Sequence, residues 1–173
     1  MNAPMATKKQ SSAPSLAPTR NDLSLNARAA LVQLLGPRLA EALDLYMRLK
    51  EAHWNVKGPQ FAELHRLFDE VASDALEYSD DIAERIVQLG GRASASARDV
   101  AERSALPLLS SPLQGWESLT GHVADVLAVF GKAVRAGIDV AAGLGDADTA
   151  DLLTEISRGV DKWLWQVEAH VQK

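Results

Sequence analysis

The stretch from Phe61 to Leu89 repeats its apolar residues with the period of an α-helix, and this pattern constrains the fold more than any other feature. On a helical wheel at about 100° per residue with His65 at zero, one arc of about 200° to 300° is apolar or aromatic. This core-facing stripe comprises Leu64, Leu67, Phe68, Val71, Ala75, Tyr78, Ile82, Ile86 and Leu89. The pair Gly90-Gly91 then supplies the left-handed conformations that commonly end a helix. The pattern therefore predicts one long helix that packs against others.

Further segments show the same period, and none has the alternation of a strand. These helical runs cover residues 31–35, 39–56, 116–142 and 148–170. Gly36-Pro37 is expected to interrupt the first two runs, and Lys57-Gly58-Pro59 is expected to stop the second. Residues 92–114 are expected to form a connection that contains one brief helix. Four long helices with a long middle crossover predict an all-α fold, a four-helix bundle of the ferritin-like kind.

Composition narrows the class of protein. The 173 residues are 47% apolar and 24% charged, as expected for one soluble domain. The absence of cysteine excludes disulfides, thiol catalysis and thiolate metal sites. The longest uncharged stretch, Ser104 to Trp116, has 13 residues and two prolines, too few to span a bilayer. Residues 1–20 lack the apolar block of a secretory signal, so we expect a cytoplasmic protein without a membrane partner.

Charge is distributed unevenly between the start of the chain and its body. Residues 1–20 contain Lys8, Lys9 and Arg20 and no acidic residue, which leaves −8 on residues 21–173 against −5 for the whole chain. We therefore divide the chain into a flexible basic N-terminal tail, 1–20, and a bundle domain, 21–173. A basic arm on an acidic body is suited to phosphate polyanions, although a simple unstructured start explains three charges as well.

The wheel of residues 61–89 also has two polar sectors. The ordinary solvent-facing sector comprises Arg66, Glu70, Asp74, Glu77, Asp81 and Arg85. The other sector mixes charged and apolar residues: His65, Asp69, Asp80 and Glu84 beside Leu76, Ala83 and Val87. Purely solvent-exposed faces seldom carry Leu and Val among their charges, so this mixed face predicts contact with a partner.

The spacing within the mixed face predicts what the partner is. His65 and Asp69 are four residues apart, as are Asp80 and Glu84, so each pair lies on one side of the helix. The pairs are about 16 Å apart along the axis, too far for both to bind one ion. If two copies pair antiparallel about the midpoint of residues 74 and 75, His65 meets Glu84 and Asp69 meets Asp80.

Such a dimer would contain two identical clusters of imidazole and carboxylate groups. This sulfur-free donor set suits Fe(II), Mn(II) or Zn(II). The alternative is a set of surface ion pairs, which is what an isolated His-x-x-x-Asp usually represents. The chain has no Glu-x-x-His motif, which disfavours a di-iron site inside one bundle and favours a site between subunits.

At this point the chain resembles a known family, the Dps family of mini-ferritins (DNA-binding proteins from starved cells), over residues 19–171. The motifs that carry the resemblance are Ala52-His53-Trp54-Asn55-Val56-Lys57-Gly58, Phe61-x-x-Leu-His65-x-x-Phe-Asp69, Asp80-x-x-x-Glu84-Arg85-x-x-x-Leu-Gly-Gly91, Asp148-Thr-Ala-Asp151-Leu and Asp161-Lys-Trp-Leu-Trp165. Thr19-Arg20-Asn21-Asp22 is similar to the segment that leads into the family's first helix.

The resemblance implies a hollow homododecamer whose two-fold interfaces hold a ferroxidase centre. Its catalytic and iron-binding residues would be His53, His65 and Asp69 of one subunit with Asp80 and Glu84 of its mate. It also implies oxidation of Fe(II), by hydrogen peroxide in preference to oxygen, and storage of ferric mineral, which protects DNA under oxidative stress. Trp54, next to His53, is either a group near the site that accepts a stray oxidising equivalent or a plain interface aromatic.

The resemblance places a three-fold pore near the start of the last helix. The candidate pore residues are Asp146, Asp151 and Glu155, although carboxylates there also suit the helix dipole. His122 and His170 have no partner at ligand spacing and are expected to be structural or solvent-facing.

The family's tails imply non-specific DNA binding through Lys8, Lys9 and Arg20, and hence association with the nucleoid. Two alternatives stay open. One is a nucleoid-compacting shell in which iron oxidation is secondary, and the other is a bundle whose ion, such as Zn(II), merely holds the dimer.

Overall fold

The chain forms four long helices and one short helix in a computed structural model that describes residues 16–108 and 115–172. The helices are α1 (Leu25–Asn55), α2 (Phe61–Gln88), α3 (Ala97–Arg103), α4 (Trp116–Gly143) and α5 (Ala147–Glu168). The described residues contain no strand, and none of their helices has the length and apolar content needed to cross a membrane. The predicted all-α bundle is confirmed, and its brief middle helix is α3.

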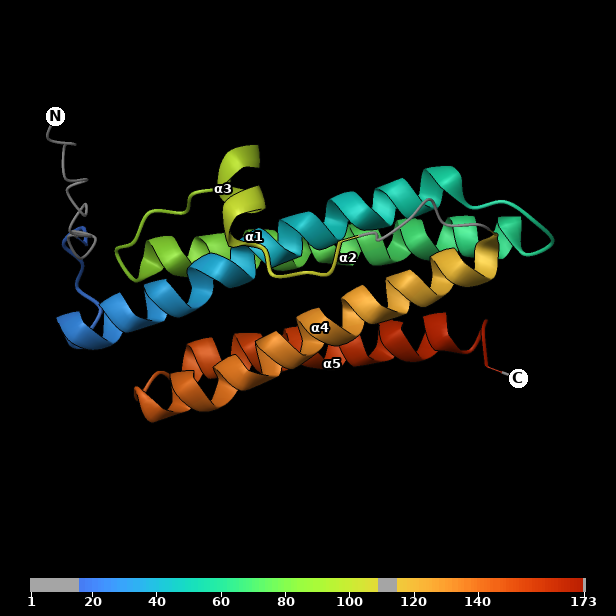
Figure 1. Cartoon of the computed structure of the whole chain (residues 1–173). Coiled ribbons are helices and arrows are strands. Elements are labelled where there is room, and N and C mark those ends of the chain that lie inside the picture. The colour runs from blue at the N-terminus through green and yellow to red at the C-terminus, as the bar shows by residue number, and fades with distance from the viewer. Residues whose placement is uncertain (1–15, 109–114, 173) are drawn as a thin grey trace, which may run out of the picture.

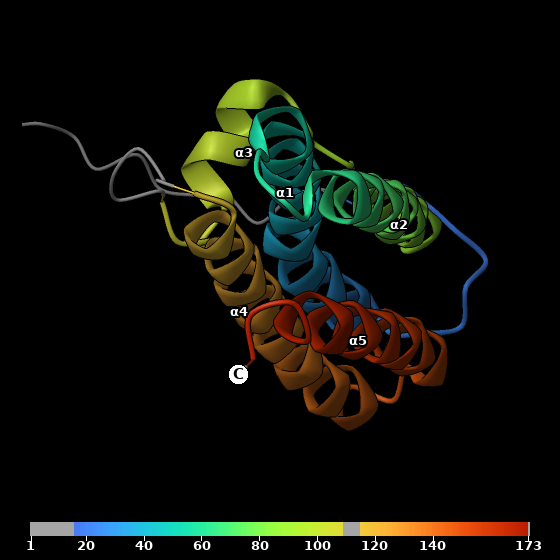
Figure 2. The same ribbon diagram turned by 90° about the vertical axis from the view of Figure 1, so that its right-hand side faces the viewer.

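The bundle consists of two antiparallel helical hairpins that pack side by side. Figure 1 shows α1 running back along α2, and α4 running back along α5. The segment after α2 that carries α3 runs back along the bundle as far as residue 108 (Figure 1). The end-on view in Figure 2 shows α1 against α4 and α2 against α5 around a common core. One face of α2 therefore packs inward, while another lies at the outside of the molecule.

The first long helix continues through Pro37, so the predicted interruption at Gly36-Pro37 was wrong. A proline inside a helix loses one backbone hydrogen bond and crowds the preceding turn. Here Leu35 and Leu39, on either side of it, are 0% and 2% exposed, and their packing into the core outweighs the local preference. Ser24 begins this helix, because its Oγ accepts a hydrogen bond from the Ala27 amide at 3.1 Å.

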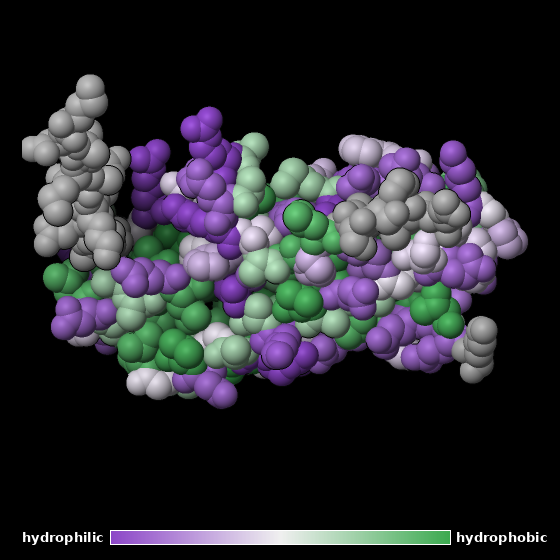
Figure 3. Space-filling model, viewed as in Figure 1, coloured by the Kyte–Doolittle hydropathy of each residue, from purple (hydrophilic) through white to green (hydrophobic). Residues whose placement is uncertain are grey.

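The core follows the apolar stripe that the sequence predicts for α2. Eight of the nine predicted residues are buried and Tyr78 is half-buried. Phe68 on α2 and Phe130 on α4 are the largest of the fully buried side chains. On the opposite, outer side of α1 and α4, Figure 3 shows polar residues interspersed with apolar ones, with apolar side chains gathered where α1 starts and α4 ends. Exposed Leu25 and Val140 belong to those two helix ends.

The segment before α1 is attached to the end of α2. The Ala17 amide donates a hydrogen bond to the Gly90 carbonyl at 2.7 Å. Gly90 has φ +85°, and a Cβ there would lie 2.6 Å from the Ala17 carbonyl oxygen, so both conformation and space require glycine. Buried Arg28 caps the same helix end by donating to the Leu89 carbonyl at 3.1 Å. Ala17, within the segment 1–20 that is predicted to be a flexible tail, is therefore hydrogen-bonded to the bundle, whereas residues 17–20 are exposed.

Two residues expected to face solvent instead connect α2 to α5. Arg85 is 9% exposed and donates to both carboxylate oxygens of Asp146, at 2.8 and 3.0 Å. Asp74 accepts a hydrogen bond from the indole nitrogen of Trp163 at 2.6 Å. The wheel did not show this, because it assigned the contacts of α2 within the subunit to a single apolar arc, whereas α2 packs against α1 and also contacts α5.

Candidate metal centre

Two histidines from neighbouring helices lie face to face at one end of the α1–α2 hairpin. His53, in the last turn of α1, and His65, in the second turn of α2, have ring centroids 3.7 Å apart and planes inclined by 21°. The tight turn through Gly58, with φ +114°, brings the two helices back alongside each other. The Phe61 ring lies 5.0 Å from the His65 ring and covers one side of the pair.

Each of the two histidines binds the backbone of the other. His53 Nδ1 lies 2.6 Å from the His65 carbonyl oxygen, and His65 Nδ1 lies 2.9 Å from the His53 carbonyl oxygen. A carbonyl oxygen only accepts hydrogen bonds, so both Nδ1 atoms carry the proton. In neutral imidazole the lone pair is then on Nε2 of both rings, which is the form that binds a metal ion. The backbone thus fixes the orientation and tautomer of both rings.

The third predicted ligand of this half, Asp69, is exposed and pairs with a lysine of α1. Lys50 Nζ lies 2.5 Å from Asp69 Oδ1. This hydrogen bond is the largest cause that holds the pKa of Asp69 below its usual value, and the nearby imidazoles act in the same direction. The carboxylate therefore stays ionised in mildly acidic solution. An exposed ion pair of this kind contributes only about 0–1 kcal/mol, so a divalent cation can displace the ammonium group.

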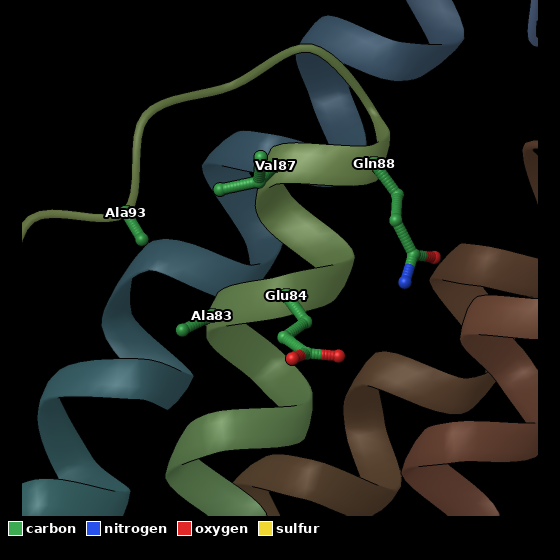
Figure 4. Close-up of a pocket in the computed structure, with 5 residues that line it drawn as sticks. All are labelled: Ala83, Glu84, Val87, Gln88 and Ala93. Atoms are coloured by element: carbon green, nitrogen blue, oxygen red, sulfur yellow. The ribbon is translucent and has the colours of Figure 1, made fainter.

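The other two predicted ligands, Asp80 and Glu84, lie further along the same helix and are both exposed. Glu84 borders an open hollow of about 400 Å³ at the end of α2, which is otherwise lined by Ala83, Val87, Gln88 and Ala93. Figure 4 shows Glu84 and Gln88 on successive turns of α2, with Ala93 in the segment that follows. Of the apolar members of this predicted partner face, Leu76 and Val87 are 46% and 58% exposed in the single chain, and Ala83 is half-buried.

The five predicted ligands thus form two separate half-sites in one subunit. Within one copy, residues 16–108 and 115–172 contain no group of three or more His, Asp or Glu side chains arranged to hold a metal ion. His53, His65 and Asp69 form the imidazole half, and Asp80 and Glu84 form the carboxylate half. Asp69, Asp80 and Glu84 are exposed on α2, and the two histidines are half-buried beside Asp69, so a second subunit has access to both halves.

Other predicted site residues lie in different surroundings. Trp54 is 68% exposed beside the imidazole half. Asp151 and Glu155 are exposed on α5, but Asp146 is 3% exposed and bound to Arg85. Asp146 also caps α5 by accepting from the Thr149 amide at 3.1 Å. Because its charge is already neutralised inside the subunit, the prediction that Asp146 lines a pore does not fit its position.

Of the three residues predicted to bind DNA, the structure describes one. Arg20 is exposed, whereas Lys8 and Lys9 lie outside the described residues.

The two remaining histidines are both half-buried and differ in their hydrogen bonding. His170 Nδ1 pairs with Gln60 Oε1 at 2.7 Å and connects the end of α5 to the start of α2. His122 on α4 is half-buried, and its Nε2 atom is buried without a hydrogen-bond partner. Burial, followed by the charge of Arg48, lowers the pKa of His122.

Sequence reasoning missed two features of the imidazole half. Lys50 precedes His53 by three residues, so helical spacing alone could have placed it on the same face of α1. No comparable signal predicts the reciprocal bonds between the histidine rings and backbone carbonyls, because they depend on how closely α1 and α2 approach.

Comparisons with known proteins agree with this architecture. A family profile described as a ferritin-like domain matches residues 32–173. A protein of Agrobacterium fabrum named "DNA protection during starvation protein" is 38% identical over 158 residues, which cover 90% of this chain and 96% of that protein.

Two solved structures superpose closely on this chain. DpsC from Streptomyces coelicolor has a TM-score of 0.88 at 27% identity and covers 96% of this chain and 97% of its own. A Vibrio cholerae protein described as a member of a broad superfamily of ferritin-like diiron-carboxylate proteins has a TM-score of 0.82 and covers 95% of this chain and 100% of its own. At 24% identity, that second likeness shows the fold alone.

Proposed function

The chain belongs to the Dps family of ferritin-like proteins, and from this membership we propose that it oxidises Fe(II) between paired subunits, stores the ferric product and thereby protects DNA. Each site would combine His53, His65 and Asp69 of one subunit with Asp80 and Glu84 of the partner subunit. The subunits would assemble into a hollow dodecamer in which twelve such sites face the mineral.

The observation that carries this proposal is the pair of histidines whose Nδ1 atoms are both held by backbone carbonyls. This arrangement leaves the Nε2 lone pair of each neutral ring available to a metal ion, and the carboxylate of Asp69, whose pKa is lowered, is near both rings. A purely structural pair of histidines would not need both ligand atoms free. The separation of the carboxylate half along α2 explains why the centre requires a second subunit.

The donor set fits iron in both of its oxidation states. Neutral imidazole favours capture of Fe(II), and carboxylates stabilise the Fe(III) that forms. Two Fe(II) ions each give up one electron, and hydrogen peroxide takes both electrons with two protons to form two water molecules. This two-electron step consumes peroxide without release of hydroxyl radical. We propose peroxide as the preferred oxidant and oxygen as the slower one.

Iron is proposed to reach the interior past the carboxylates at the start of α5. Asp151 and Glu155 are exposed there, and carboxylates grouped around a symmetry axis raise the local concentration of cations. Asp146 is left out of this route because Arg85 neutralises it.

The test is anaerobic loading of the assembled protein with Fe(II), followed by peroxide, with ferric absorbance and spin-trapped hydroxyl radical recorded together. The test variant is Asp80→Ala/Glu84→Ala. Its matched control is Glu77→Ala/Asp81→Ala, which removes the same charge at the same spacing from the exposed solvent side of α2. We expect rapid ferric growth without radical in wild type and control, and loss of this behaviour in the test variant.

Equal ferric growth in wild type and test variant would overturn the site assignment. Dissociation of the test variant into single subunits with unchanged iron turnover would instead favour an ion that only holds the dimer. Subunit mass is therefore measured on the same samples by light scattering.

We propose that DNA binding is a second activity, carried by Lys8, Lys9 and Arg20. Residues 21–173 carry −8, so the basic tail is the part that phosphate can approach favourably. Twelve tails on one shell would add weak contacts through avidity. Deletion of residues 1–15 should abolish the gel shift of plasmid DNA at low salt and leave iron oxidation unchanged. Unchanged DNA binding after this deletion would assign the contact to another surface.

A further inference from the structure

The turn between α1 and α2 joins the two histidines of the imidazole half, and backbone hydrogen bonds define both of its ends. It covers residues 56–60. Val56 is 1% exposed, and its amide donates to the Ala52 carbonyl at 2.9 Å at the end of α1. The Phe61 amide donates to the Gly58 carbonyl at 3.1 Å where α2 begins. Two further helices contact this turn from outside the hairpin.

The first external contact connects the end of α5 to Gln60. His170 lies in the turn that follows α5, and its Nδ1 atom is 2.7 Å from Gln60 Oε1. An amide oxygen only accepts hydrogen bonds, so Nδ1 carries the proton and donates it. Both side chains are half-buried, which limits competition from water. Gln60 occupies the N-cap position of α2, but its side chain makes no capping hydrogen bond, so it is available for the contact with His170.

The second external contact is between α4 and Gly58. A Cβ at Gly58 would lie 2.8 Å from Cδ1 of Trp116, the first residue of α4. The indole ring therefore packs directly on the backbone of the turn. Trp116 is half-buried and also packs against the hydrophobic core. Two helices that contribute no ligand to the proposed centre thus hold the turn that joins its histidines.

The geometry of the imidazole half depends on the position of this turn. Each histidine ring is bound to the backbone carbonyl of the other histidine, at 2.6 and 2.9 Å. Such hydrogen bonds are weak beyond about 3.2 Å, so a displacement of α2 along α1 by less than about 1 Å would loosen at least one of them. Gln60 precedes His65 by about 7.5 Å of helix rise, so a shift of the N-cap moves the His65 ring with it.

We propose that His170 is a positioning residue for the imidazole half. By holding Gln60, it keeps His53 and His65 in the orientation that presents both Nε2 atoms to a metal ion, and Trp116 supports the same turn from α4. His170 itself touches no metal, because its effect passes through Gln60 and the first turn of α2. The inference rests on the proposed function for the identity of the metal, whereas the effect on the two rings is present without metal.

The test variants separate the hydrogen bond from the bulk of the side chain. His170→Ala removes the donor, whereas His170→Asn keeps an amide N–H near the position of Nδ1. Gln60→Ala removes the acceptor and costs no capping bond, because this side chain does not cap α2. The matched control is Gln172→Ala, which shortens an exposed side chain two residues after His170. Light scattering checks that each variant assembles like wild type.

The first measurement uses the assembled, metal-free protein. Deuterium exchange at imidazole Cε1 is followed by mass spectrometry in peptides that contain His53 and His65. We expect faster Cε1 exchange of both rings in His170→Ala and in Gln60→Ala, and recovery of the wild-type rate in His170→Asn. The double variant His170→Ala/Gln60→Ala should match the single variants, because all of them remove the same bond. Cε1 exchange reports on the rings themselves, so loosening of the chain only around residue 170 would not change it.

The second measurement is titration of the same proteins with Co(II), followed by the visible absorption of the bound ion. We expect the dissociation constant to rise about two- to ten-fold in His170→Ala, the factor that corresponds to one hydrogen bond, and the absorption bands to shift. Absence of a Co(II) spectrum in wild type would count against the proposed function, and Cε1 exchange would still test the inference.

Three outcomes would overturn the inference. One is equal Cε1 exchange of His53 and His65 in wild type and His170→Ala. Another is an effect of Gln172→Ala as large as that of His170→Ala. The third is an equal loss in His170→Asn and His170→Ala, which would show that the hydrogen bond to Gln60 does not position the rings.

Discussion

Replacement of Arg85 by methionine should destabilise the subunit far more than the same replacement at Arg135. Both arginines form an ion pair with a closest nitrogen-to-oxygen distance of 2.8 Å, Arg85 with Asp146 and Arg135 with Asp161. They differ in burial, because the side chains of the first pair are 10% and 3% exposed and those of the second 49% and 53%. Arg85 also donates to both oxygens of Asp146, whereas Arg135 donates to one oxygen of Asp161, so the comparison tests burial together with this added hydrogen bond.

The expected magnitude follows from what each replacement leaves behind. Arg85→Met leaves the Asp146 carboxylate buried with only Thr149 as partner, and an uncompensated buried charge costs about 3–5 kcal/mol. For a chain of this length that corresponds to a loss of about 6–20 °C in Tm. Arg135→Met removes an exposed pair, which is worth about 0–1 kcal/mol.

The pH dependence gives a second reading of the same pair. Burial alone would raise the pKa of Asp146, but hydrogen bonds from Thr149 and Arg85 outweigh it and hold the pKa below its usual value. Stability from this group is therefore present above the unfolded pKa and is lost as pH falls through the folded pKa. Without Arg85 the carboxyl group protonates more easily, so the gap between wild type and Arg85→Met should narrow below about pH 4.

Urea and thermal unfolding of the assembled proteins at one protein concentration would measure these differences. A change at Arg85 within about 1 kcal/mol of that at Arg135 would refute the reasoning, because it would show that burial does not set the value of the pair.

Three further changes have defined outcomes. Lys50→Met should raise the pKa of Asp69 toward its usual value and remove the ammonium group that competes with a metal ion for this carboxylate. We therefore expect Co(II) to bind up to about five-fold more tightly in a calorimetric titration. Weaker Co(II) binding would show instead that Lys50 positions the carboxylate. Gly90→Ala places a Cβ on a left-handed backbone and against the Ala17 carbonyl oxygen, so it should lower the free energy of urea unfolding more than Gly145→Ala. At Gly145, φ is +79° but a Cβ would have no atom within 4 Å. Equal losses would show that the contact with Ala17 adds no cost. Burial holds the pKa of His122 below its value in the unfolded chain, so the free energy of unfolding should fall as pH drops through about 6.5. In urea unfolding between pH 7 and 5, His122→Gln should show a smaller fall than wild type. An equal fall in the two proteins would contradict this role of His122.

Much of the fold could be predicted because each long helix carries its own periodic signal. The buried stripe of α2 and the ends of α4 and α5 agree with the structure to within two residues. The mixed face of α2 could also be predicted, since exposed Leu76 and Val87 stand among its charges in the single chain. Its role as a metal centre stays a prediction.

The predictions from sequence were wrong where contacts between helices determine the local structure. Pro37 looks like a helix breaker locally, but the core on both sides keeps α1 continuous. Arg85 and Asp146 are 61 residues apart in the chain, so no local pattern relates them, and each alone resembles a surface charge. The same holds for Asp74 and Trp163.

The division of the proposed centre between two subunits couples iron chemistry to assembly. In a single copy, the imidazole half and the carboxylate half are held apart along α2. Among the described residues, no group of three or more His, Asp or Glu side chains is arranged to hold a metal ion. A metal ion that binds only paired subunits stabilises the pair by mass action. This stabilisation grows with the ratio of the metal concentration to its dissociation constant. On this proposal an unpaired subunit would lack the second half needed to hold Fe(III), so oxidation would be confined to paired subunits. Exposed Leu76 lies between the two halves, beside the proposed two-fold axis, so its burial would accompany completion of both centres at once.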